Sequence, residues 1–144
     1  MTREILIGID IHGDRATVKN AVSTSKGLAS FWTSDSTAEP VAGSEAKFGF
    51  EGAPMGLRFS VDKIGDDGVD WTCVEGFPGW NRTTVSWGFG DEPEHGGTRV
   101  LFRHAGFADD QPDWDIASVT ETWAKVLEQL KVYVETGTAE PVLG

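Results

Sequence analysis

The C-terminal part of the chain changes from a strand-like to a helix-like hydrophobic period, and this change limits the possible folds more than any other feature. Between residues 112 and 136 apolar side chains recur every three or four positions, at Ile116, Val119, Trp123, Leu127, Leu130 and Val134. Asp113 and Asp115 suit the positive end of a helix, and Gly137 suits its C-terminal cap. The pattern predicts a helix of about 25 residues, about 37 Å long, which can span a whole sheet.

The preceding sequence has the alternation of strands, with one early exception. Alternation predicts strands at about residues 4–12, 44–51, 56–64, 69–75, 82–89 and 98–107. Two short helices, at residues 14–23 and 24–32, follow the first strand, with Asp14 and Thr24 in capping positions. The order predicts an α+β fold in which a curved antiparallel sheet of about six strands surrounds the long helix. We expect a single domain at residues 1–137 and a frayed tail at 138–144.

Composition excludes several classes of function. The chain has 144 residues, a formal net charge of −11 and a pI near 4.5, which disfavours nucleic acid and anionic membranes. No apolar run is long enough for a membrane span, so we expect no membrane insertion. The single cysteine and the charged N-terminal residues Arg3, Glu4 and Asp10 favour a cytoplasmic location.

Four segments resemble a known superfamily in their order and spacing: "RATVKNAVSTSKGLASFW", "GSEAKFGF", "GGTRVLFRHAGF" and "TETWAKVLEQLKVYVETG". The chain resembles the START-related, birch-pollen-allergen-like SRPBCC superfamily. It is most similar to the branch that includes the C-terminal domain of activators of the ninety-kilodalton heat-shock-protein ATPase (AHSA-like). The resemblance implies a helix-grip fold with a hydrophobic cavity between sheet and helix. It also implies a chaperone as a macromolecular partner, and contact with a second copy of the chain is the other partner that we consider.

Strand parity and this resemblance together predict which side chains line the cavity. The apolar candidates are Trp32, Phe48, Phe50, Phe59, Val61, Trp71, Cys73, Val85, Trp87, Phe89, Phe102, Trp123 and Leu127. Because these side chains are bulky, we expect a modest cavity near the lower end of the roughly 300–1,000 Å³ typical of ligand sites, or a core that is completely filled.

Three polar residues share this parity near the ends of their strands. Lys63, Glu75 and His104 either converge at the cavity mouth or simply reach solvent. If Glu75 and His104 were buried together, they could transfer protons near neutral pH, so they are the candidate catalytic residues.

Other chemistry-bearing residues favour structural roles. Cys73 is expected to be a small buried apolar residue rather than a nucleophile. The three histidines, His12, His95 and His104, lack metal-ligand spacing, and the acidic residues Asp109, Asp110, Asp113 and Asp115 lack the pattern of a calcium loop. We expect no metal and no cofactor.

Three functions remain, in this order. The first is a binding module for a small hydrophobic or amphipathic molecule. The second is an enzyme resembling polyketide cyclases or aromatases, with Glu75 and His104 as acid and base. The third is a chaperone-related interaction protein.

Overall fold

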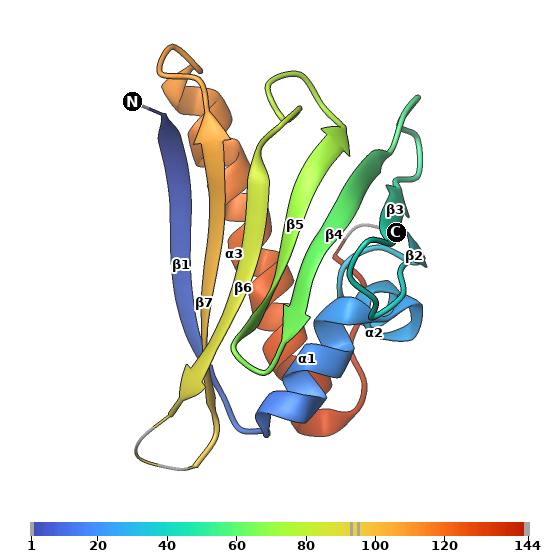
Figure 1. Ribbon diagram of the computed structural model, residues 1–144, viewed down its shortest axis with the longest axis vertical. Coiled ribbons are helices and arrows are strands. Elements are labelled where there is room, and N and C mark those ends of the chain that lie inside the picture. The colour runs from blue at the N-terminus through green and yellow to red at the C-terminus, as the bar shows by residue number, and fades with distance from the viewer. Residues whose placement is uncertain (1, 93, 95, 143–144) are drawn as a thin grey trace.

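The computed structural model describes residues 2–92, 94 and 96–142, and its main element is one curved antiparallel sheet. The strand order is β1-β7-β6-β5-β4-β3-β2, with β1 and β2 at the two edges (Figure 1). The strands are β1 (Arg3–Ile11), β2 (Asp35–Thr37), β3 (Glu45–Gly49), β4 (Leu57–Gly65), β5 (Gly68–Glu75), β6 (Thr84–Asp91) and β7 (Thr98–Phe107). The helix-grip prediction is confirmed, and the sheet has seven strands where about six were expected.

The additional strand is β2, which lies in a segment that the sequence indicated to be a polar connection. Its three residues pair with β3, from Asp35 opposite Gly49 to Thr37 opposite Lys47. None of the three residues of β2 is apolar, so the sequence has no apolar–polar alternation there that would predict a strand. The pairing comes from the neighbouring strand, because β3 offers a free edge there.

Two short helices follow β1, as predicted. Helix α1 (Arg15–Ser23) begins after Asp14, whose carboxylate accepts a hydrogen bond from the Thr17 N–H at 2.8 Å. Helix α2 (Ser25–Phe31) begins after Thr24, whose hydroxyl accepts from the Gly27 N–H at 3.1 Å. Each cap satisfies a backbone donor that would otherwise lack a partner at the start of its helix.

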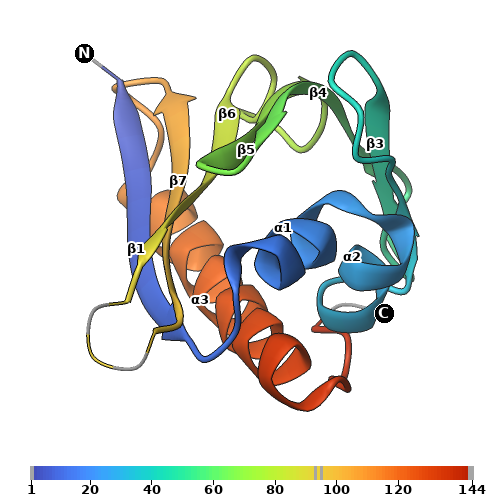
Figure 2. The ribbon, with the colours of Figure 1, turned by 60° about the horizontal axis from the view of Figure 1, so that its bottom comes forward.

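The long helix α3 (Asp113–Thr136) packs across the concave face of the sheet, and α1 and α2 close the remaining side (Figure 2). Its buried residues are Trp123, Val126, Leu127 and Leu130. On the two turns before Trp123, Ile116 and Val119 are only half-buried. The first half of α3 therefore covers the sheet less tightly than the second half.

Residues 138–142 do not extend away from the domain. The Val142 N–H donates to the Phe31 carbonyl oxygen at 3.4 Å, and Ala139 and Val142 pack against the core. The part of the expected tail that the structure describes thus lies against α2. Across the described residues, no helix combines the length and the apolar character required to cross a bilayer.

Candidate functional site

Most of the side chains that were expected to line a cavity instead fill the interior of the grip. Eleven of them have 2% exposure or less: Trp32, Phe48, Phe59, Val61, Trp71, Cys73, Val85, Trp87, Phe102, Trp123 and Leu127. Their rings pack closely, as in the contacts of Trp71 with Phe59 at 5.3 Å and with Trp87 at 5.7 Å between centroids. The bulk of these side chains therefore closes the centre of the grip, because a protein interior packs to high density when its side chains allow it.

A cavity of about 150 Å³ remains under the first half of α3. Its lining is Trp32, Phe50, Leu57, Phe77, Trp80, Ser118, Val119, Thr122 and Trp123. Of the residues predicted to line a cavity, only Trp32, Phe50 and Trp123 do so here. The volume of this cavity is below the expected range. The cavity lies where α3 covers the sheet least tightly.

Five aromatic side chains form a closed circle around this cavity. We call them the aromatic circle: Trp32, Phe50, Phe77, Trp80 and Trp123. Successive ring centroids are 6.1, 5.7, 5.3, 6.3 and 5.0 Å apart, and the last of these distances, from Trp123 to Trp32, closes the circle. The five residues come from four places in the chain: the C-terminal end of α2, the end of β3, the β5–β6 loop and α3. Only the tertiary structure brings them together.

The β5–β6 loop contributes two members of the circle through a tight turn. The Trp80 N–H donates to the Phe77 carbonyl oxygen at 2.9 Å, with Pro78 and Gly79 at the two central positions. Gly79 has φ of +87°, as the third residue of a type II turn requires. The "FPGW" sequence thus places Phe77 and Trp80 on the same cavity.

A second cavity of about 210 Å³ adjoins the first. It is lined by Phe77, Pro78, Trp80, Phe107, Gln111, Asp115, Ile116, Ser118 and Val119. The two cavities share Phe77, Trp80, Ser118 and Val119. Side chains of the β5–β6 loop and of α3 therefore separate two adjacent compartments.

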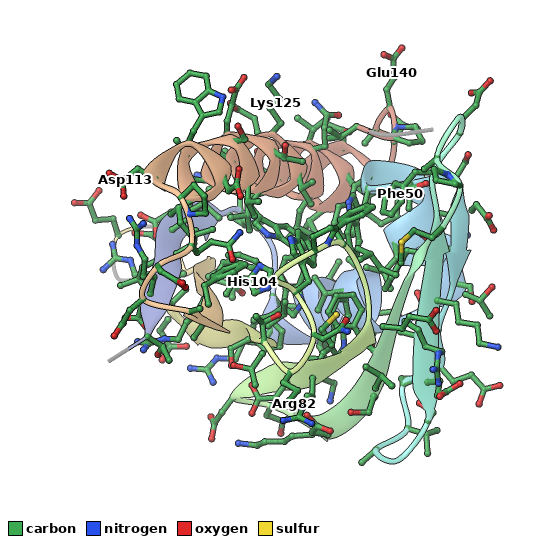
Figure 3. The ribbon with its side chains drawn as sticks, turned by 90° about the horizontal axis from the view of Figure 1, so that it is seen from above. Phe50, Arg82, His104, Asp113, Lys125 and Glu140 are labelled. Atoms are coloured by element: carbon green, nitrogen blue, oxygen red, sulfur yellow. The ribbon has the colours of Figure 1, made fainter. Side chains whose placement is uncertain are left out.

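His104 lies in the interior between sheet and helix, next to this site (Figure 3). The Trp123 Nε1–H donates to His104 Nδ1 at 3.1 Å, so Nδ1 is unprotonated and the neutral ring carries its proton on Nε2. Nε2 lies 2.9 Å from the Thr83 hydroxyl, which in turn donates to the Trp80 carbonyl oxygen at 2.6 Å. Burial lowers the pKa of His104 from 6.5 to about 3. His104 thus links the sheet, α3 and the β5–β6 loop as a neutral group.

Glu75 does not meet His104, and the parity argument that placed it on the inner face is wrong. The ladder between β4 and β5 pairs Arg58 with Glu75 but Phe59 with Cys73, so Val74 is an extra residue in a β-bulge. The bulge reverses the parity, and the Glu75 carboxylate lies 3.2 Å from the Arg58 guanidinium with 61% of its side chain exposed. The proposed acid–base pair is therefore not formed.

Lys63 is turned outward for the same reason. Val61 pairs with Trp71 and Lys63 with Asp70, which leaves Asp62 as the extra residue of a second bulge. Lys63 is exposed and shares its face with Asp70 rather than with the core. Strict alternation had placed both Lys63 and Glu75 on the inner face. That prediction fails because a single inserted residue reverses the face of every later side chain in the strand.

The remaining candidates have structural environments. Cys73 is buried, and desolvation raises the pKa of its thiol to about 11, which makes it a poor nucleophile at neutral pH. Within the described residues no group of three or more His, Cys, Asp and Glu side chains is arranged to hold a metal ion, and His95 lies outside those residues.

The Trp87 indole N–H is the buried side-chain donor in the described structure that lacks a hydrogen-bond acceptor. Four rings surround Trp87 at steep angles, those of Phe31, Trp71, Phe102 and Trp123.

Comparison with solved structures identifies the fold family. The solution structure of the Aha1 dimer from Colwellia psychrerythraea superimposes with a TM-score of 0.80 at 30% sequence identity, over 94% of this chain and 98% of that one. The chain belongs to the helix-grip SRPBCC superfamily. Ara h 8.0201, at 13% identity, matches this SRPBCC protein with a TM-score of 0.71 over 93% of this chain and 98% of its own chain.

A third solved structure has a biosynthetic context. DynU16, from the dynemicin biosynthetic locus, matches the SRPBCC protein with a TM-score of 0.75 at 18% identity, over 98% of this chain and 49% of the DynU16 chain. No protein-family model matches the sequence, and no curated protein matches it significantly.

Sequence reasoning missed six residues that line the first cavity of the SRPBCC domain: Leu57, Phe77, Trp80, Ser118, Val119 and Thr122. Phe77 and Trp80 lie in a loop, where strand parity predicts no orientation for a side chain. The signal for Ser118 and Thr122 was present, because they lie four residues apart on one helix face, next to the face that carries Val119 and Trp123. Val119 had been assigned to the apolar face of the helix without a role in the site.

Proposed function

We propose that this protein is a binding module for a small apolar or amphipathic molecule, and that the cavity inside the aromatic circle is its site. The observation that supports this most directly is a partly open space under α3 that is walled by five aromatic rings in an otherwise filled grip. Ligand sites are typically concave and mostly apolar, with few polar groups. Here the hydroxyls of Ser118 and Thr122 are the polar side chains of the lining.

The alternative of a cyclase-like enzyme rested on Glu75 and His104, and the geometry argues against that pair. Glu75 is bound to Arg58 at the surface, and His104 already uses both ring nitrogens. A neutral imidazole whose pKa is about 3 is a weak base near pH 7. Binding without this acid–base chemistry is the function that the site supports best.

The proposal is tested by titrating the ¹⁵N-labelled protein with benzyl alcohol, a neutral molecule small enough for this cavity. We expect saturable shifts in the indole N–H signals of Trp32, Trp80 and Trp123, and no shift in that of Trp114, which is 79% exposed on α3. Val119→Phe should abolish the shifts by filling the cavity, whereas Ala117→Phe, on the exposed face of the same helix, should preserve them. Shifts that do not saturate, or that persist in Val119→Phe, would overturn the proposal.

A second candidate function comes from the likeness to Aha1 at 30% identity over nearly the whole chain. It supports membership of the AHSA-like branch, with a chaperone or a second copy of the chain as partner. Trp114 is a suitable contact, because tryptophan is enriched at interface hot spots. Sedimentation of the protein alone and with a ninety-kilodalton heat-shock protein would test this. Association that Trp114→Ala weakens supports the second candidate, and a lone monomer in both experiments rejects it.

A further inference from the structure

We propose that the aromatic circle selects the methylated ammonium group of an organic cation. This inference rests on the proposed function, because it names the ligand class for the same cavity. It follows from three properties of the site: its rings, its charge and its size.

The spacing of the rings matches that of a cation–π site. Neighbouring centroids in the aromatic circle are 5.0 to 6.3 Å apart. A regular five-membered circle with such sides has its centre about 5 Å from each centroid, which is within the roughly 6 Å over which a cation is attracted to a ring face. Three of the five rings are tryptophans, the side chain with the strongest cation–π attraction. A cation in the centre would therefore lie within this distance of all five ring centroids.

The charge of the site excludes anionic ligands. Among the described residues that line either cavity there is no Lys, Arg or His, so nothing there can pair with a carboxylate or phosphate. The one ionisable side chain that lines either cavity is Asp115, whose carboxylate accepts a hydrogen bond from the Gln111 amide at 3.0 Å. The formal net charge of −11 adds a field of the same sign. Both the lining and the whole molecule therefore favour a positive ligand.

The size and the mostly apolar lining of the cavity favour methylated over primary ammonium groups. A cavity of about 150 Å³ accepts a molecule of benzene's size, and a trimethylammonium group is comparable. A primary ammonium is strongly hydrated and has three donors to satisfy, whereas the side-chain acceptors of this lining are the two hydroxyls of Ser118 and Thr122. A methylated ammonium loses less hydration and presents apolar methyl groups to the rings. The cavity should therefore discriminate among cations of equal charge.

Three water-soluble probes test each property separately, by calorimetry and tryptophan fluorescence at physiological salt. The first is choline, the second is its uncharged carbon isostere 3,3-dimethylbutan-1-ol, and the third is ethanolamine, which has the same charge without the methyl groups. We expect choline to bind roughly ten-fold more tightly than the isostere, from cation–π attraction, and more tightly than ethanolamine.

Each other result has a distinct meaning. If the isostere binds as tightly as choline, or more tightly, the cation inference is overturned while the proposed binding function stands. If ethanolamine equals choline, the attraction is only that of a negatively charged surface, and the inference is overturned. If none of the probes binds and benzyl alcohol also fails, both the inference and the proposed function are wrong.

A single substitution isolates the contribution of the rings. Phe77→Leu at the half-buried mouth keeps an apolar side chain and removes one π face, so choline binding should weaken roughly five-fold while the isostere changes less than two-fold. Tyr133→Leu, an aromatic-to-leucine change at a half-buried ring outside both linings, is the matched control and should change neither. Equal losses for the two probes in Phe77→Leu would show that packing, not the π face, determines binding.

Discussion

At the scale of single residues, His104 illustrates how a candidate catalytic group becomes a structural one. Both ring nitrogens are engaged, with Trp123 on one side and Thr83 on the other. A second proton would have to enter at Nδ1, where the Trp123 N–H already points. The buried ring is therefore stable only in its neutral form, and its role is to join three parts of the fold.

This arrangement predicts a specific loss of stability in mild acid. The pKa of His104 is about 3 in the folded protein and near 6.5 when exposed, so the unfolded state gains a proton first as the pH falls. Stability should be full above pH 6.5 and fall by up to about 1.4 kcal/mol per pH unit toward pH 3. His104→Gln, whose amide can accept from Trp123 and donate to Thr83, should flatten this fall between pH 6.5 and 4.5. Urea unfolding at several pH values measures the free energy of unfolding of both proteins. If this free energy falls as steeply with pH in His104→Gln as in the original protein, the prediction is contradicted.

At the scale of elements, the β5–β6 loop and the bulges of β4 and β5 determine what faces the cavity. The turn from Phe77 to Trp80 has glycine, Gly79, at the position that requires a positive φ. A Cβ at this position would approach the Gln111 side-chain oxygen to 2.4 Å, so the loop and the start of α3 are packed closely here. The turn, rather than any regular element, fixes the positions of Phe77 and Trp80.

Gly79→Ala should therefore affect both the stability and the site. Left-handed backbone costs a residue with a Cβ about 1–2 kcal/mol, and the displaced Gln111 also loses its hydrogen bond to Asp115. Gly43→Ala is the matched control, because Gly43 has φ of +91° and a Cβ added there would meet nothing within 4 Å. Urea unfolding should show comparable backbone costs for both, and benzyl alcohol binding should weaken only in Gly79→Ala. Equal affinity of the two variants for benzyl alcohol would show that this turn does not determine the geometry of the site.

At the scale of the whole molecule, an excess of acidic side chains surrounds a core of aromatic rings. The chain has 23 Asp and Glu residues against 12 Lys and Arg, and the ion pairs of the described residues lie at its surface. Such pairs contribute little, whereas unpaired like charges repel one another in the compact state. The net charge thus attracts cations and destabilises the fold at the same time.

Screening this repulsion should stabilise the protein. Sodium chloride raised from about 0.01 M to 0.3 M shortens the Debye length from roughly 30 Å to under 10 Å, so the thermal midpoint at pH 7 should rise by a few degrees. Calorimetry at several salt concentrations measures this. At a pH near the pI of 4.5 the same salt should have little effect, because little net charge remains to be screened. A salt response of the same size at both pH values would contradict the explanation.

The sequence by itself determined the order of elements, the caps of α1 and α2, the long helix and the apolar interior. These features depend on periodicity and on side chains close in the chain, which local physical chemistry governs. Only the tertiary structure decided the orientation of Lys63 and Glu75, since each follows a bulge that pairing between β4 and β5 creates. It also decided the aromatic circle, whose members come from four separate segments, because packing across the chain determines which space the rings fill and which they leave open.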